Sequence, residues 1–134
     1  MREGPASSLR ADPSNPGGKP RSRLRISPIH SVVVTNELFH NGNVEAWKRI
    51  IGSYGRRYPD LQVFVYYDGE RIVDLNALFK WGKVKHGSAI EFAVVGENLA
   101  GVDVLHRCLA EAASYRYAKF LLGSVNSDLV FRGD

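Results

Sequence analysis

Residues 38–47 read Leu38-Phe39-His40-Asn41-Gly42-Asn43-Val44-Glu45-Ala46-Trp47, and the rest of the chain is organised around them. A run rich in β-branched residues, 29–35, precedes this stretch and predicts a strand. Apolar residues recur after it at spacings of three and four, which is the pattern of one helix face: Val44, Trp47, Ile50, Ile51 and Tyr54. His40 is therefore expected where a loop meets the N-terminus of a helix.

The first N–H groups of a helix lack partners within the helix and lie at the positive end of its dipole. A phosphate or carboxylate is stabilised at such a place without any side chain. His40 is thus a candidate phosphoryl acceptor beside an anion site made by Asn41, Gly42 and Asn43. A histidine at this position also serves simply to cap or precede a helix, and position alone favours that role. Asn41 or Asn43 is the expected N-cap, and Gly55 the expected helix end.

Length and charge point to one folded domain with a basic arm. A chain of 134 residues with 44% apolar content can bury a real core. Residues 1–25 contain six basic and two acidic residues, which accounts for the whole net charge of +4, and the remainder balances twelve against twelve. The arm is rich in Pro, Gly, Ser and Arg and is expected to be disordered. The neutral body argues against a domain built for nucleic acid.

Several classes of site have no signature in this chain. No apolar run is long enough to cross a bilayer and no secretory signal precedes the domain, so a cytoplasmic protein without membrane insertion is expected. The single cysteine, Cys108, cannot form an internal disulfide and is expected to fill the core. His30, His86 and His106 lack zinc-ligand spacing, and no nucleotide-binding motif occurs, so the sequence predicts neither a metal nor a cofactor.

The second half of the chain alternates strand and helix patterns. Residues 61–67 predict a strand, Asp68-Gly69 a hairpin turn, residues 71–73 a return strand, and Asp74 the cap of a short helix. A further strand over 89–95 and an apolar helix stripe from Val102 follow, and residues 115–134 are apolar enough to pack in part on the body. This order predicts an α+β fold, an antiparallel sheet with helices on one face.

Three motifs in order resemble the HPr family, the phosphocarrier of the bacterial phosphotransferase system. They are the histidine before the first helix, the short-helix segment 74–80, and the run 85–97 that opens the last strand. The resemblance covers roughly residues 29–113. It implies an HPr-like open-faced sandwich over residues 26–114, with a four-stranded antiparallel sheet covered on one face by three helices.

The same resemblance bears on the site. The family's motif runs apolar, His, x, Arg, Pro, Ala, whereas this chain has Gly42 in place of the arginine and Asn43 in place of the proline. Losing a charge-assisted bidentate pair costs on the order of 1.5–3 kcal/mol, which slows transfer without forbidding it. The family's regulatory serine matches Ala77, which has no hydroxyl. Partner docking is implied for four apolar residues, which are equally typical of a core-facing turn: Phe39, Leu78, Phe79 and Trp81.

Three functions compete at this point. The first is an HPr-like phosphocarrier or regulatory protein of a phosphoenolpyruvate-dependent phosphotransferase system, which accepts a phosphoryl group on His40 from an enzyme I-like kinase. The alternative is a degenerate HPr-like adaptor that binds phosphotransferase-system or other regulatory proteins without moving phosphate. The third is nucleic-acid binding through the arm, which would be strongly salt-dependent. A carrier or adaptor, rather than an enzyme with its own turnover, is the expectation.

Overall fold

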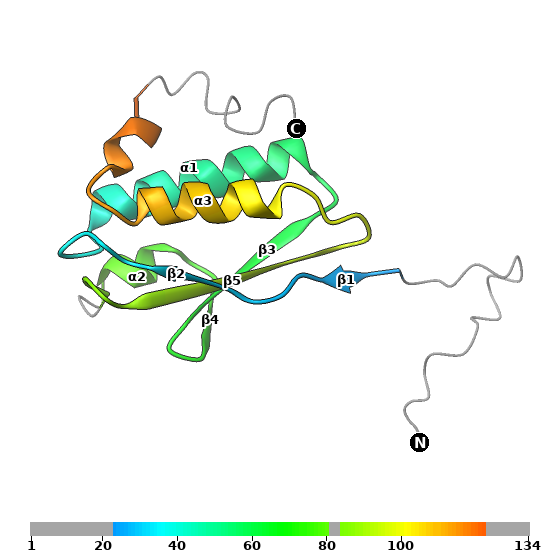
Figure 1. Ribbon diagram of the computed structural model, residues 1–134, viewed down its shortest axis with the longest axis horizontal. Coiled ribbons are helices and arrows are strands. Elements are labelled where there is room, and N and C mark those ends of the chain that lie inside the picture. Colours follow the sequence, from blue (N-terminus) through cyan, green and yellow to red (C-terminus); the bar gives the residue numbers. More distant parts are fainter. Residues whose placement is uncertain (1–22, 81–83, 123–134) are drawn as a thin grey trace, which may run out of the picture.

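The computed structural model describes residues 23–80 and 84–122. Its elements are β1 (Arg25–Ile26), β2 (His30–Val33), α1 (Asn41–Arg57), β3 (Gln62–Tyr67), β4 (Glu70–Ile72), α2 (Asn76–Lys80), β5 (Ala89–Gly96), α3 (Val102–Ala112) and the 3₁₀ helix η1 (Tyr117–Phe120). Helices α1 and α3 pack side by side over one face of the sheet (Figure 1). The predicted α+β class, with an antiparallel sheet and helices on one face, is confirmed.

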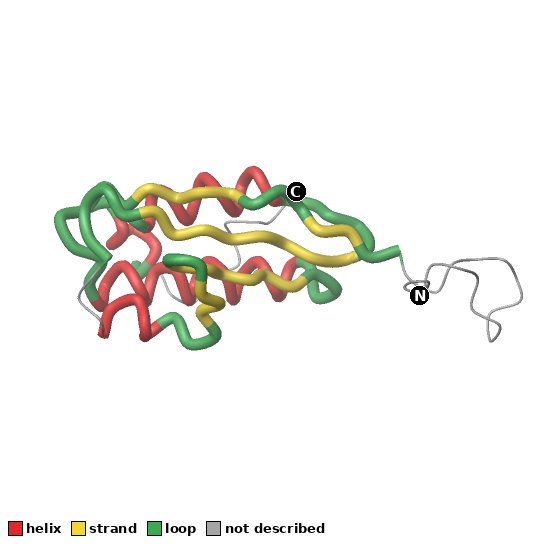
Figure 2. The backbone as a smooth tube through the Cα atoms, turned by 90° about the horizontal axis from the view of Figure 1, so that it is seen from below, coloured by secondary structure: helices red, strands yellow, loops and turns green. Residues whose placement is uncertain are grey.

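The sheet is open and antiparallel throughout, with β5 at its centre. β5 pairs with β3 on one side and with both β1 and β2 on the other, and β4 pairs with the outer side of β3. Seen from below, the strands lie in front of the two long helices (Figure 2). Val65 and His30 both lie opposite Phe92, so these three residues share the face that the helices cover.

The predicted count of four strands is wrong, because a short additional strand, β1, precedes the predicted first strand and also pairs with β5. Between β1 and β2, the hydroxyl oxygen of Ser27 accepts the N–H of Val94 at 2.9 Å, in place of a backbone carbonyl. Pro28 follows and has no N–H to donate, so regular pairing stops there and resumes at His30. Arg25, which the sequence placed in the arm, pairs with Gly96 as the first residue of β1.

The hairpin at Asp68-Gly69 forms as predicted. Both residues have positive φ, 54° and 81°, and the flanking Tyr67 and Glu70 pair across the turn. Two positive φ values in a two-residue loop match the right-handed twist of the flanking strands, and Gly69 accepts such a value without strain. This turn fixes the register of β3 against β4.

Helix α1 is longer than predicted. It continues through Gly55 to Arg57, and Tyr58 still donates its N–H to the Tyr54 carbonyl at 2.8 Å. Gly55 in a helical conformation adds no break of its own, whereas Pro59 disfavours helix in the residue before it, so the helix ends there. The apolar face of α1 is buried as its spacing predicted, and the Tyr54 hydroxyl donates to the Ala100 carbonyl at 2.6 Å.

The segment after α3 folds back onto α1. Tyr117, Phe120 and Leu121 pack against the core, and Arg49 of α1 donates to the Leu121 carbonyl at 3.4 Å. Figure 1 shows η1 lying beside the N-terminal end of α1. The 3₁₀ helix therefore lies close to the loop that carries His40.

Candidate functional site

His40 is itself the N-cap of α1. Its backbone is extended (φ −98°, ψ −172°), and its Nδ1 accepts the N–H of Gly42 at 2.9 Å. The N–H of His40 donates in return to Oδ1 of Asn43 at 3.0 Å, which completes a reciprocal capping box. The prediction that Asn41 or Asn43 caps the helix is wrong. An unprotonated imidazole nitrogen accepts the early N–H just as a hydroxyl or carboxylate oxygen would.

The Asn43 side chain has a structural role at the site. It is fully buried, and its Nδ2 donates to the carbonyls of Ala112 at 2.9 Å and Ser114 at 3.2 Å. Its Oδ1 accepts from His40 and also from Nδ2 of Asn36 at 3.2 Å. The side-chain amide thus joins the start of α1 to the end of α3, and it is not available to hold a phosphate.

The opposite face of the imidazole contacts Tyr117 of η1. The two rings meet edge to face, with centroids 4.8 Å apart and an interplanar angle of 83°. Gly42 lies close to the Tyr117 ring, and a Cβ at Gly42 would collide with Cε1 of Tyr117. A side chain at Gly42, including the arginine that the HPr motif has there, would require η1 to move.

The hydrogen bonds fix which ring nitrogen carries a proton. Because Nδ1 of His40 accepts from Gly42, the proton of the neutral ring lies on Nε2. Nε2 lies 3.4 Å from Nδ2 of Asn36, which is also a donor because the Asn36 amide is oriented by its bonds to Glu37 and Asn43. In this tautomer the longer contact is therefore not a hydrogen bond. Half-buried His40 therefore directs its Nδ1 lone pair at the Gly42 N–H, at the start of α1.

Two of the four predicted docking residues are buried. Phe39 is 1% exposed and packs edge to face on Trp47 with centroids 5.5 Å apart, and Leu78 is fully buried. For these two residues the structure agrees with the core-facing alternative and not with partner docking, because their side chains fill the core. Phe79 remains 43% exposed on α2. Trp81 lies outside the described residues.

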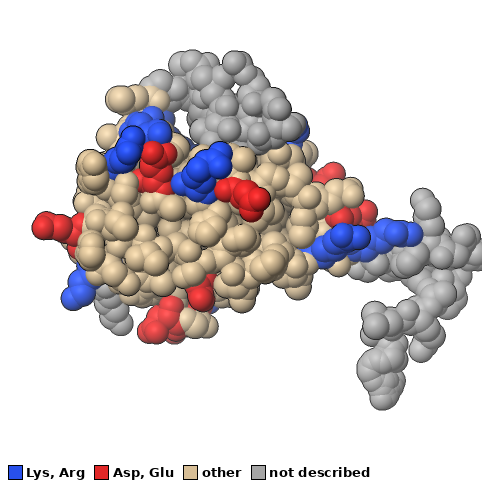
Figure 3. All heavy atoms as spheres, in the orientation of Figure 1, with Lys and Arg blue, Asp and Glu red and all other residues tan. Residues whose placement is uncertain are grey.

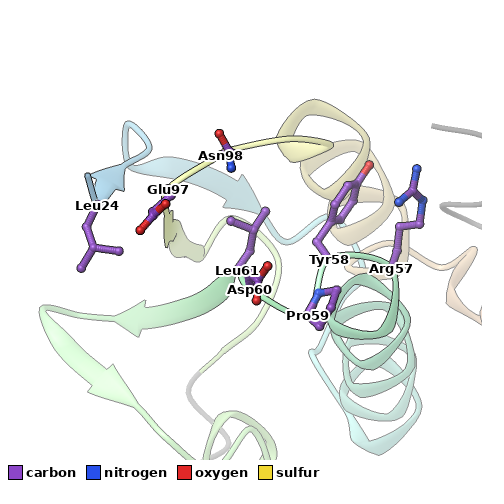
Figure 4. Close-up of a pocket in the computed structure, with 8 residues that line it drawn as sticks. All are labelled: Leu24, Arg57, Tyr58, Pro59, Asp60, Leu61, Glu97 and Asn98. Atoms are coloured by element: carbon purple, nitrogen blue, oxygen red, sulfur yellow. The ribbon is translucent and has the colours of Figure 1, made fainter. Parts of the chain in front are cut away.

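A pocket lies at the other end of α1, far along the helix from His40 (Figure 4). Its volume is about 610 Å³, and its lining residues include the basic Arg57 and the acidic Asp60 and Glu97. Arg57 lies over the Tyr58 ring, with the guanidinium carbon 4.8 Å from the ring centroid. This hollow shares no residue with the His40 cap and has mixed charge.

Basic and acidic side chains are intermixed on the side of the molecule that Figure 3 shows. Glu111 of α3, for example, pairs with Lys119 at 2.8 Å and with Arg116 at 3.6 Å. Within residues 23–80 and 84–122, no group of three or more His, Cys, Asp and Glu side chains is placed to hold a metal ion. Over the same residues, no helix combines the length and apolar character needed to cross a membrane.

The structure thus defines an α+β domain with a histidine-capped helix that its own C-terminal segment covers. Residues 24–119 match the sequence profile of the family described as "Uncharacterised Treponema protein C-terminal domain", and the chain belongs to this family. The matched segment begins just before β1 and extends through most of η1. The family includes the Tyr117 segment as well as the sandwich itself.

The chain is similar to a longer protein of the same genus name as the family. This relative is an uncharacterized protein of Treponema pallidum (strain Nichols), 60% identical over 106 residues. The aligned part is 79% of this chain but 31% of the relative, so the chain spans about a third of that protein's length. No solved structure matches the chain significantly.

Proposed function

We propose that this domain is an HPr-like phosphoryl acceptor with a carrier or regulatory role, and that His40 is the acceptor. The observation that carries the proposal is the 2.9 Å bond between His40 Nδ1 and the Gly42 N–H at the start of α1, made by a residue that is only partly buried. The order of elements supports it, since β2 takes the place of the first strand in the series that resembles HPr.

Phosphorylation of Nδ1 would exchange one bond for another. The Nδ1 lone pair would attack phosphorus as the bond from phosphorus to the donor breaks, and the Gly42 N–H would then face a phosphoryl oxygen instead of nitrogen. Helix N–H groups and the positive end of the α1 dipole favour the added negative charge. Asn41 is exposed, and its N–H is the neighbouring donor at this helix start.

Tyr117 takes the space that the HPr arginine would need above Gly42. Its Cζ, which carries the hydroxyl, lies 3.0 Å from where a Cβ of Gly42 would be. A phenolic O–H close to this point supplies a neutral donor to a phosphoryl oxygen. Such a bond contributes about 0.5–1.5 kcal/mol, against about 1.5–3 kcal/mol for one made to a charged group, so slower transfer than in an arginine-containing site is expected.

The test uses the full chain with two phosphoryl donors: an enzyme I-like kinase with phosphoenolpyruvate, and potassium phosphoramidate, which needs no partner protein. We expect one acid-labile adduct with a phosphohistidine signal in phosphorus NMR. The adduct should disappear in His40→Ala and persist in the control His86→Ala, since His86 is an exposed turn residue. Absence of an adduct with both donors would remove the acceptor role.

A second function, the adaptor without phosphoryl transfer, is favoured by one observation. The cap bond and the Tyr117 ring already occupy two sides of His40, so the histidine has a sufficient structural role. An adaptor predicts that Phe79→Ala weakens capture of a phosphotransferase-system or other regulatory partner while His40→Gln leaves capture unchanged. A carrier predicts that partner binding differs between the phosphorylated and unphosphorylated forms. A cytoplasmic location belongs to both proposals.

A further inference from the structure

Two histidines from distant parts of the chain meet between β2 and α3. Nδ1 of His30 lies 3.2 Å from Nδ1 of His106, although 76 residues separate them. Nε2 of His106 lies 3.1 Å from the carbonyl oxygen of Ser31. A carbonyl can only accept, so Nε2 of His106 carries the proton and its Nδ1 presents a lone pair toward His30.

The separation of the two nitrogens fits a shared metal ion. Zn–N bonds of about 2.0–2.1 Å at angles between about 90° and 110° place two ligand nitrogens about 2.9–3.4 Å apart. The separation of 3.2 Å between His30 and His106 falls in this range. The bond from His106 to the Ser31 carbonyl is also the outer-shell contact that fixes the tautomer and orientation of a metal-binding imidazole.

Both rings are held in place by Phe92 of β5. The His30 ring stacks on Phe92 with centroids 5.1 Å apart at 17°, and the His106 ring meets Phe92 edge-on at 5.8 Å and 74°. Both histidines are only partly buried, so solvent and ions reach them. A preorganised, accessible pair of imidazoles loses little conformational freedom when it binds an ion.

We propose that His30 and His106 form a two-imidazole site for a divalent late first-row transition ion, of which Zn²⁺ is the representative. The ion lies off the line between the two Nδ1 atoms and accepts a lone pair from each, and the proton of His30 moves from Nδ1 to Nε2. Imidazole nitrogen suits zinc, copper and nickel and disfavours Mg²⁺. No third protein ligand joins the pair within the described residues, so water or a partner's side chain completes the coordination.

The alternative occupant of this space is a proton, in a direct hydrogen bond between the two rings. That reading needs no ion and predicts no more affinity for Zn²⁺ than scattered surface histidines have. The metal reading predicts one preferred Zn²⁺ per chain, bound by both Nδ1 atoms. The inference does not depend on the proposed role of His40, because it uses neither that residue nor its contacts.

The experiment is calorimetric titration of the full, tag-free chain with Zn²⁺ at fixed pH, with Mg²⁺ as the control ion. We expect His30→Ala and His106→Gln each to weaken Zn²⁺ binding at least about tenfold, since loss of even an outer-shell partner costs 10–100-fold. His106→Gln keeps an N–H able to reach the Ser31 carbonyl. Two control variants, His86→Ala and Cys108→Ser, should bind Zn²⁺ as the wild type does.

Nitrogen NMR of the imidazoles gives a readout that does not depend on folding stability. Zn²⁺ should shift the Nδ1 resonances of His30 and His106 together, at one equivalent, and leave those of His86 in place. The proposal is overturned if wild-type chain shows no preferred Zn²⁺ site. It is equally overturned if the two histidine variants, folded by circular dichroism, bind Zn²⁺ within twofold of wild type.

Discussion

Replacement of Asn43 by alanine should destabilise the domain far more than any surface asparagine would. The substitution removes the acceptor of the His40 N–H and the donor to the Ala112 and Ser114 carbonyls, all at a fully buried position. Loss of a helix cap costs about 0.5–2 kcal/mol, and leaving a buried polar group without a partner costs about 1–3 kcal/mol. Because alanine is the better helix former, some of this is offset.

The expected net loss is therefore about 2–4 kcal/mol, a large part of the 5–15 kcal/mol typical of a whole domain. The assay is urea denaturation of the full chain followed by tryptophan fluorescence, to which the buried Trp47 contributes. Asn41→Ala is the matched control, since Asn41 is exposed on the same first turn. We expect the control to stay within about 0.5 kcal/mol of wild type.

The reasoning about Asn43 fails if Asn43→Ala and Asn41→Ala have the same midpoint and slope. Asn43→Asp gives a sharper version of the same test. It keeps an acceptor for the His40 N–H but points a carboxylate oxygen at the two carbonyls that now accept from Nδ2. We expect Asn43→Asp to be no more stable than Asn43→Ala, because a buried unpaired charge costs several kcal/mol.

Three further outcomes follow from the packing. Gly42→Arg should lower stability by about 1–3 kcal/mol through collision with Tyr117, and a double-mutant cycle with Tyr117→Ala should recover most of it. Burial raises the pKa of the Tyr54 hydroxyl far above its ordinary value of 10.0, so the stability that this group contributes is complete below pH 10 and is lost as pH rises further. Above pH 10, the free energy of unfolding of Tyr54→Phe should therefore fall less steeply with pH than that of wild type. In thermal unfolding, Leu78→Ala should cost about 2–5 kcal/mol, whereas half-exposed Phe79→Ala should cost under about 1 kcal/mol.

The elements that follow from periodicity could be predicted from the sequence. The apolar spacing of α1 and the alternation in β3 and β5 show which face of each element meets the core, and this spacing can be read from neighbouring residues alone. The Asp68-Gly69 turn is similarly local, because it needs only residues that accept positive φ. These are the parts of the fold in which prediction and structure agree.

The candidate site could be predicted only in part, because half of it comes from elsewhere in the chain. The position of His40 at a helix start follows from its neighbours, but its role as the cap depends on which lone pair faces Gly42. Tyr117 lies 75 or more residues away on a 3₁₀ helix with no periodic signal, and no local pattern links it to the first helix. The His30–His106 contact was missed for the same reason, since each residue alone has an ordinary setting.

The capping role of His40 and its proposed phosphoryl-accepting role are coupled rather than exclusive, because both use the same lone pair on Nδ1. Any group attached to that nitrogen must take the Gly42 N–H away from it and must share the space beside Gly42 with Tyr117. A group bound to His40 therefore changes the free energy of the contact between α1 and η1, and that contact changes the free energy of attaching the group by the same amount. If the proposed acceptor role holds, the η1 segment that carries Tyr117 would respond directly to the state of His40.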